Sequence, residues 1–95
     1  MKLVNENIVN EKIEKEIIPL IKDYIKENIS DSLTLSDFEE DSCGYGDFEK
    51  ITYTYNNYQF VIQIDTEYDD NDDVKYNIDT LRAYYKSYAQ EKVLY

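Results

Sequence analysis

The sequence predicts an α+β fold, in which an N-terminal amphipathic helix packs on a small antiparallel sheet of three or four strands and a C-terminal helix follows. Alternating apolar and polar residues flank a turn at Asn56 and Asn57, which is typical of a β-hairpin. An apolar stripe at helical spacing runs through residues 6–29. With 95 residues and 42% hydrophobic content, the chain can bury one modest core, so we expect residues 1–95 to form a single domain.

The first predicted element is the helix over residues 6–29. Pro19 interrupts it, because a proline inside a helix removes a backbone donor and bends or breaks the helix. Pro19 lies on the polar side, where a bent helix is convex towards solvent, and this favours one bent helix over two short ones. The apolar arc, at about 100° per residue, consists of Val9, Ile13, Ile17, Leu20, Ile21, Tyr24 and Ile25.

A short strand and an acidic loop are predicted next. Leu33, Leu35 and Phe38 indicate the strand, with polar residues on its opposite face. Residues 39–47 then read as a loop, because both glycines of the chain lie there among acidic residues.

The hairpin, over residues 48–65, organises the centre of the chain. Asparagine tolerates the positive φ that a two-residue hairpin turn requires, so the turn fixes how the two strands pair. Because side chains alternate between faces, the apolar positions lie on one face and mostly polar positions face water. The predicted pairs are Tyr55 with Tyr58, Tyr53 with Phe60, and Ile51 with Ile62.

Beyond the hairpin, its second strand is expected to continue to Glu67 and to end in an acidic turn at residues 69–73. Residues 74–78 alternate as a further strand, with Val74, Tyr76 and Ile78 on one face. Asp79 or Thr80 then caps a helix over residues 80–92, although the same tyrosines also fit a continued strand. The side chains that share a face of this helix are Leu81, Tyr84, Tyr85 and Tyr88.

The negative charge is concentrated in the middle of the chain. The net charge is −11, and residues 31–73 alone carry −12, against −1 for residues 1–30 and +2 for residues 74–95. Such a charge repels nucleic acid and anionic membranes and attracts basic proteins. A single cysteine, no apolar leader and no long apolar run lead us to expect a cytoplasmic protein, in the host cell cytoplasm if a phage encodes it.

Residues that usually carry catalysis or bind metals are scarce. The chain has no histidine, which excludes Ser-His-Asp and Cys-His arrangements, and Cys43 lies among acids that disfavour its thiolate. Residues 69–73 begin like a calcium loop, but Val74 and Thr80 occupy the positions of its essential Gly and Glu. We therefore expect no enzyme, no metal site and no cofactor.

The remaining candidate site is a surface of carboxylates with adjacent tyrosines, which bind well at interfaces because they are stiff and amphipathic. On one strand face, alternate carboxylates stand roughly 6.6 Å apart. A stiff sheet is expected to align them into one continuous anionic wall. The predicted partner-binding residues are Glu39, Glu40, Asp41, Tyr45, Asp47, Asp65, Glu67, Tyr68, Asp69, Asp70, Asp72 and Asp73.

In general character, the small acidic chain resembles the nucleic-acid-mimicking inhibitors of phages and mobile elements, including anti-CRISPR and anti-restriction proteins. That resemblance implies a non-enzymatic inhibitor and a basic, nucleic-acid-binding partner such as a Cas effector or nuclease. An immunity protein that neutralises a basic toxin has the same physical character. A structural or assembly protein that self-associates, with a homodimer formed through Tyr84, Tyr85 and Tyr88, is the third reading.

Overall fold

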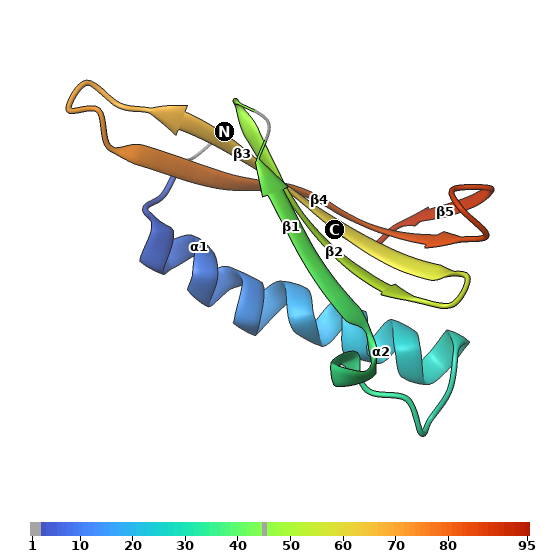
Figure 1. Cartoon of the computed structure of the whole chain (residues 1–95). Helices are drawn as coiled ribbons and strands as arrows, with labels where there is room; N and C mark the ends of the chain where they lie inside the picture. Colours follow the sequence, from blue (N-terminus) through green and yellow to red (C-terminus); the bar gives the residue numbers. More distant parts are fainter. Residues whose placement is uncertain (1–2, 45) are drawn as a thin grey trace.

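The protein is an α+β structure of one N-terminal helix and a five-stranded antiparallel sheet, described here by a computed structural model for residues 3–44 and 46–95 (Figure 1). Strands adjacent in sequence are adjacent in the sheet, so the sheet is a meander. The molecule is elongated, with extents of 46 × 25 × 21 Å. The strands are β1 (Glu39–Gly44), β2 (Phe48–Tyr55), β3 (Tyr58–Tyr68), β4 (Val74–Tyr85) and β5 (Gln90–Val93).

The helix runs from α1 (Glu6–Lys12) through a π-helical turn, η1 (Ile13–Ile17), into α2 (Ile18–Asn28). Asn5 caps it, because the side-chain Oδ1 accepts the Ile8 N–H at 3.0 Å. The wide π-helical turn lies directly before Pro19, which has no N–H to donate, and the chain remains one helix as predicted. None of the helices among the described residues combines the length and the apolar content that a membrane crossing requires.

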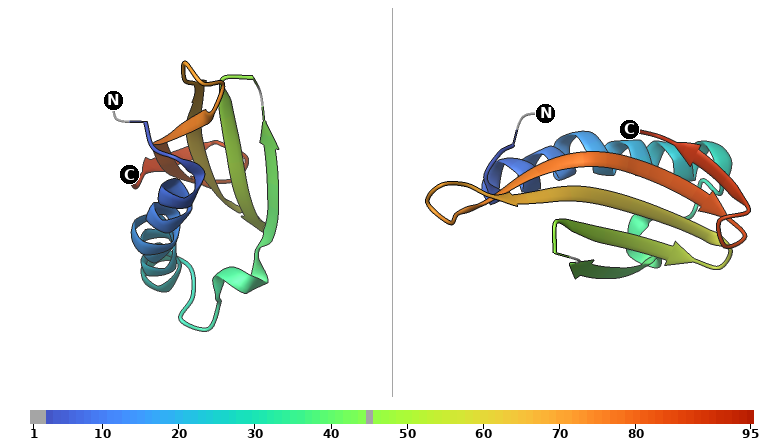
Figure 2. Two further views of the ribbon diagram at one scale, coloured as in Figure 1. Left: turned by 90° about the vertical axis from the view of Figure 1, so that its left-hand side faces the viewer. Right: turned by 90° about the horizontal axis from the view of Figure 1, so that it is seen from above.

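The core lies between the apolar stripe of the helix and one face of the sheet, which we call the inner face (Figure 2). Tyr24 meets Phe60 edge-on with ring centroids 5.6 Å apart, and Phe38 packs on Phe60 at the same separation. The helix runs on the side of the sheet nearer β4 than β1, so it covers only part of the inner face. Side chains with less than 2% exposure are Ile17, Ile21, Ile25, Phe60, Ile62 and Leu81.

The central hairpin has the register that the sequence predicts. Tyr55 faces Tyr58, Tyr53 faces Phe60 and Ile51 faces Ile62 across β2 and β3. Asn56 has φ +51°, which is the left-handed conformation expected at this turn.

The prediction for residues 33–44 was wrong, whereas Gly46 and Asp47 lie in a loop as expected. Leu35–Asp37 is a single 3₁₀ turn, in which Thr34 and Asp37 bond reciprocally, and the Thr34 N–H reaches the Asp37 carboxylate at 2.9 Å. The strand lies in the acidic stretch that was expected to be a loop, where β1 pairs with β2. Strand pairing uses backbone groups alone, so an exposed edge strand tolerates acidic side chains that would not suit a central one.

The expected C-terminal helix over residues 80–92 was also wrong, and the sheet has five strands instead of three or four. β4 continues to Tyr85, and a turn returns the chain along β5. Lys86, Ser87 and Tyr88 all have positive φ, at 57°, 52° and 75°. Residues of these types rarely adopt that conformation, so the sequence carried no turn signal. Tyr84 and Tyr85 consequently lie on opposite faces of β4 and do not form the predicted shared face.

A β-bulge in β4 changes which residues of that strand point to the inner face of the sheet. The register shifts between Gln63 and Ile64, so that Ile62 pairs with Leu81 and Ile64 with Ile78. Both partners face the core because Asp79, the extra residue, is left out of the alternation. The bulge therefore removes the acidic side chain of Asp79 from the regular alternation between the two faces.

Candidate interaction surface

The face of the sheet opposite the helix, which we call the outer face, positions the central carboxylates. Asp65 and Glu67 are two residues apart on β3 and lie together on this face, as the sequence predicts. The β1–β2 loop reaches the same place, because the Thr66 N–H donates to the Asp47 carbonyl oxygen at 2.9 Å. Backbone pairing thus brings together carboxylates that are far apart in sequence.

Asp65 lies between two other carboxylates, Asp47 and Asp79. Burial raises the pKa of Asp65, and the negative charges of Asp79 and Asp47 raise it further. Asp79 was absent from the predicted site because the sequence placed it at the start of a helix. Its position depends on the bulge, which leaves no clear signature in the sequence.

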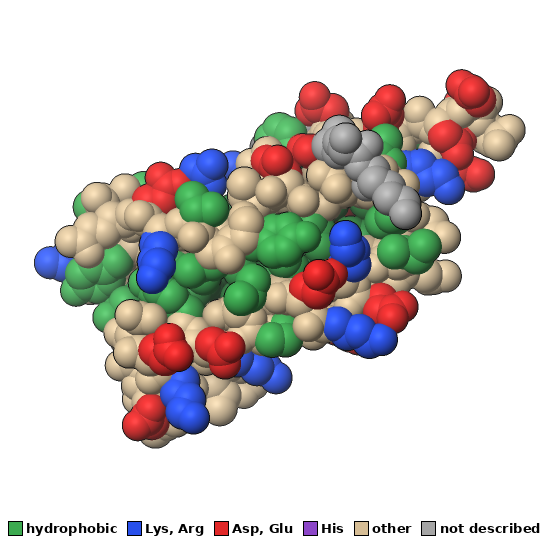
Figure 3. Space-filling view, turned by 180° about the vertical axis from the view of Figure 1, so that it is seen from behind, with side chains coloured by type: hydrophobic (Ala, Val, Ile, Leu, Met, Phe, Trp, Pro, Cys, Tyr) green, Lys and Arg blue, Asp and Glu red, His purple; other side chains and the backbone are tan. Residues whose placement is uncertain are grey.

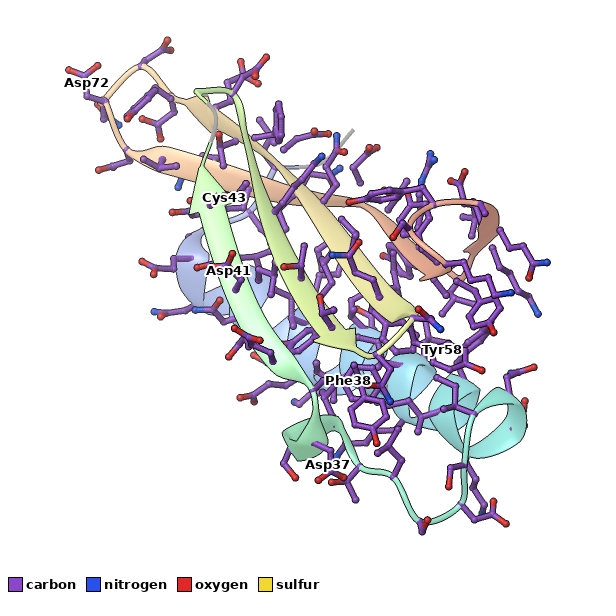
Figure 4. All side chains as sticks on the ribbon, turned by 45° about the vertical axis from the view of Figure 1, so that its right-hand side comes forward. Asp37, Phe38, Asp41, Cys43, Tyr58 and Asp72 are labelled. Atoms are coloured by element: carbon purple, nitrogen blue, oxygen red, sulfur yellow. The ribbon has the colours of Figure 1, made fainter. Side chains whose placement is uncertain are left out.

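The β3–β4 loop, residues 69–73, extends this group of acids. Asp69 holds the loop together, since its Oδ1 accepts the N–H groups of Asn71 and Asp73 at 2.8 and 3.0 Å. Lys75 lies 3.8 Å from its other carboxylate oxygen. Asp70, Asp72 and Asp73 are exposed, with Asp72 at one end of the molecule (Figure 4).

We call this group the acidic end. It comprises Asp47, Asp65, Glu67, Asp69, Asp70, Asp72, Asp73 and Asp79. Viewed from behind, carboxylates gather around the projecting end of the sheet, whereas both signs of charge alternate over the rest of that face (Figure 3). Among the described residues, Lys75 is the base that forms an ion pair there.

The other predicted site residues do not join the acidic end, so the wall is not continuous. Glu39 and Asp41 lie on the outer face of β1, away from the tip of the loop (Figure 4). Tyr68 is 68% exposed but is on the inner-face side of β3. Tyr45 lies outside the described residues.

Glu40 lies on the inner face, where its carboxylate accepts the Tyr53 O–H at 3.1 Å. Burial raises the pKa of Tyr53 to about 12, and the hydrogen bond to Glu40 and the negative charge of that residue add to the effect. The pair fixes one side chain of β1 over β2, so Glu40 has a structural partner and contributes little to the charge of the outer face.

Comparison with known proteins gives no family for this chain. No protein-family model, curated protein or solved structure matches it. What the acidic end can bind therefore follows from its described residues alone. Among them, no three Cys, Asp or Glu side chains converge in a way that would hold a metal ion.

Replacing Asp65 with asparagine is expected to stabilise the protein by about 0.5 kcal/mol at pH 7, on the scale of screened surface charges. The raised pKa means that ionisation of Asp65 opposes folding above its ordinary value of 3.8. This cost in folding free energy is absent at a pH well below 3.8, and it grows as the pH rises from 3.8 to the higher pKa of Asp65 in the folded protein. Urea unfolding of both proteins at pH 7 and near pH 3.5 measures the difference, which should shrink at the lower pH.

Asp31→Asn, on the exposed loop after α2, is the matched control for that comparison. It removes the same charge away from Asp47 and Asp79. A gain of equal size in the control variant, or a gain for Asp65→Asn that does not change with pH, would contradict the assignment of repulsion to the acidic end.

Proposed function

We propose that this protein is a small, non-enzymatic inhibitor that occupies a basic nucleic-acid-binding site on a partner protein, and that the acidic end makes the contact. The proposal rests chiefly on Asp65, whose pKa is raised by burial and, further, by the negative charges of the neighbouring Asp79 and Asp47. Repulsion of this kind lowers the stability of the free protein. A cationic groove on a partner relieves it, so part of the electrostatic energy favours binding.

The carboxylates of the acidic end resemble the charge pattern of a nucleic acid, and their loop has a defined shape before binding. Duplex DNA presents closely and regularly spaced phosphates, and Asp65 and Glu67 stand roughly 6.6 Å apart on one strand. The Asp69 carboxylate accepts two backbone N–H groups and so gives the β3–β4 loop a defined shape, and the exposed carboxylates of the loop therefore require little ordering on binding. Cas effectors and restriction enzymes are the partners we would test first, because both hold nucleic acid in basic channels.

The test is displacement of a fluorescently labelled duplex from a panel of purified Cas effectors and restriction enzymes. The protein should displace the label from its target. The triple variant Asp47→Asn, Asp65→Asn and Asp79→Asn should require about tenfold more protein, as expected when close charges at an interface are removed. Raising the salt from about 50 to about 500 mM should weaken the wild-type protein strongly. A ternary complex with the duplex still bound, or binding unaffected by salt, would contradict the proposal.

A further inference from the structure

β1 leaves one side of its backbone unpaired. Glu39, Asp41 and Cys43 bond to β2, because the two-residue turn of the neighbouring hairpin fixes which residues of β2 face β1. The alternate residues, Glu40 and Ser42, therefore direct their N–H and C=O groups away from the sheet. In agreement, the Ser42 N–H donates at 2.9 Å to the side chain of Asp41 and not to β2.

This open edge is exposed to solvent. Every residue of Glu39–Gly44 is exposed, and no other strand among the described residues pairs with that side of β1. A free strand edge is a template for a further strand, and proteins that do not use such an edge usually cover it, shorten it or place charged side chains on it.

An apolar groove lies beneath the same edge. The helix covers the inner face near β4 and leaves a groove of about 870 Å³ between itself and the β1–β2 side, which is within the size range of binding sites. Half of its lining residues are polar, and the charged ones are Glu14 and Lys22 of the helix and Glu40 of β1. The apolar residues that line it are Ile13, Ile18, Leu35, Phe38, Ile51 and Tyr53.

We propose that the open edge of β1 binds an extended segment of another protein, in which basic and apolar residues alternate, as a sixth antiparallel strand. One set of its side chains would lie on the outer face beside Glu39 and Asp41 and should be basic. The other set would point towards the groove and should be apolar, because side chains alternate between faces.

The charge of β1 distinguishes this occupant from a second copy of the chain. The strand contains three acids and no base, so only a basic partner strand is complementary to it. β5, the opposite edge, has four residues with one lysine and one glutamate, and offers no such complement. The inference does not depend on the proposed function, because the edge and groove are separate from the acidic end.

The probe is a capped heptapeptide that alternates lysine and valine, titrated into isotopically labelled protein and followed by NMR. Amide exchange should slow at Glu40 and Ser42, whose N–H groups face the open edge. In an antiparallel addition the groove-facing valines make the backbone bonds, so N-methylation of the valines should weaken binding about tenfold or more. N-methylation of the lysines preserves those bonds and is the matched peptide control.

Variants of the protein at Ser42 test the same backbone bonds from the side of β1. Ser42→Pro removes an N–H that faces the open edge and not β2, and edge strands accept proline at such positions. It should weaken peptide binding about tenfold, whereas Ser42→Ala should leave it unchanged. Equal binding of both methylated peptides, a loss confined to the lysine-methylated one, or shifts limited to the acidic end would overturn the proposal. The proposal would also be overturned if the protein sediments as a dimer in which the Glu40 and Ser42 amides are already protected from exchange.

Discussion

Replacing Phe60 with alanine is expected to lower the free energy of unfolding by about 3–5 kcal/mol. Phe60 is 1% exposed and contacts Tyr24 of the helix and Phe38, which follows the 3₁₀ turn. Its ring therefore joins three segments in one core, and removal leaves a cavity that these aromatic neighbours fill poorly. Because small domains are stable by about 5–15 kcal/mol, the variant should be close to the limit of folding.

Urea unfolding followed by far-UV circular dichroism measures this loss. Tyr68→Ala is the control, since Tyr68 lies on the same strand and is 68% exposed. Its stability should stay within about 0.5 kcal/mol of the wild type. A small loss for Phe60→Ala would mean that the helix, β3 and the 3₁₀ turn do not share a core.

The elements that the sequence predicted correctly have strong local signals. The Asn56–Asn57 turn and the alternation around it determine one register, since a slip of one residue would turn Phe60 and Ile62 to solvent. The apolar stripe of the helix is equally unambiguous, because Val9, Ile17 and Ile21 recur at helical spacing and are all buried.

The elements that were missed depend on tertiary contacts. β1 is a strand because β2 offers it an edge, although its residues read locally as a loop. The last hairpin turns through Lys86, Ser87 and Tyr88 in a conformation that sequence rules assign to Gly or Asn. The shared face of Asp65 and Glu67 follows from strand alternation on β3, whereas the approach of Asp47 and Asp79 depends on a loop contact and a bulge.

Charge reversal in the β3–β4 loop is expected to slow association with the target enzyme by about 10–100-fold at low salt, if the acidic end steers binding. The variant carries Asp70→Lys, Asp72→Lys and Asp73→Lys. Asp69 is retained, because its carboxylate bonds the backbone of the loop and its replacement would alter the fold as well as the charge. Dissociation should change less than association, since long-range attraction acts mainly on the encounter.

The control variant carries Asp23→Lys, Glu27→Lys and Asp31→Lys, which change the net charge by the same amount at the opposite end of the molecule (Figure 1). Stopped-flow association of both variants with the enzyme identified by duplex displacement gives the comparison. Because the two variants have equal net charge, any excess slowing by the loop variant must come from position. Equal slowing would show that overall charge accounts for the attraction, and the acidic end would then have no special part in recognition.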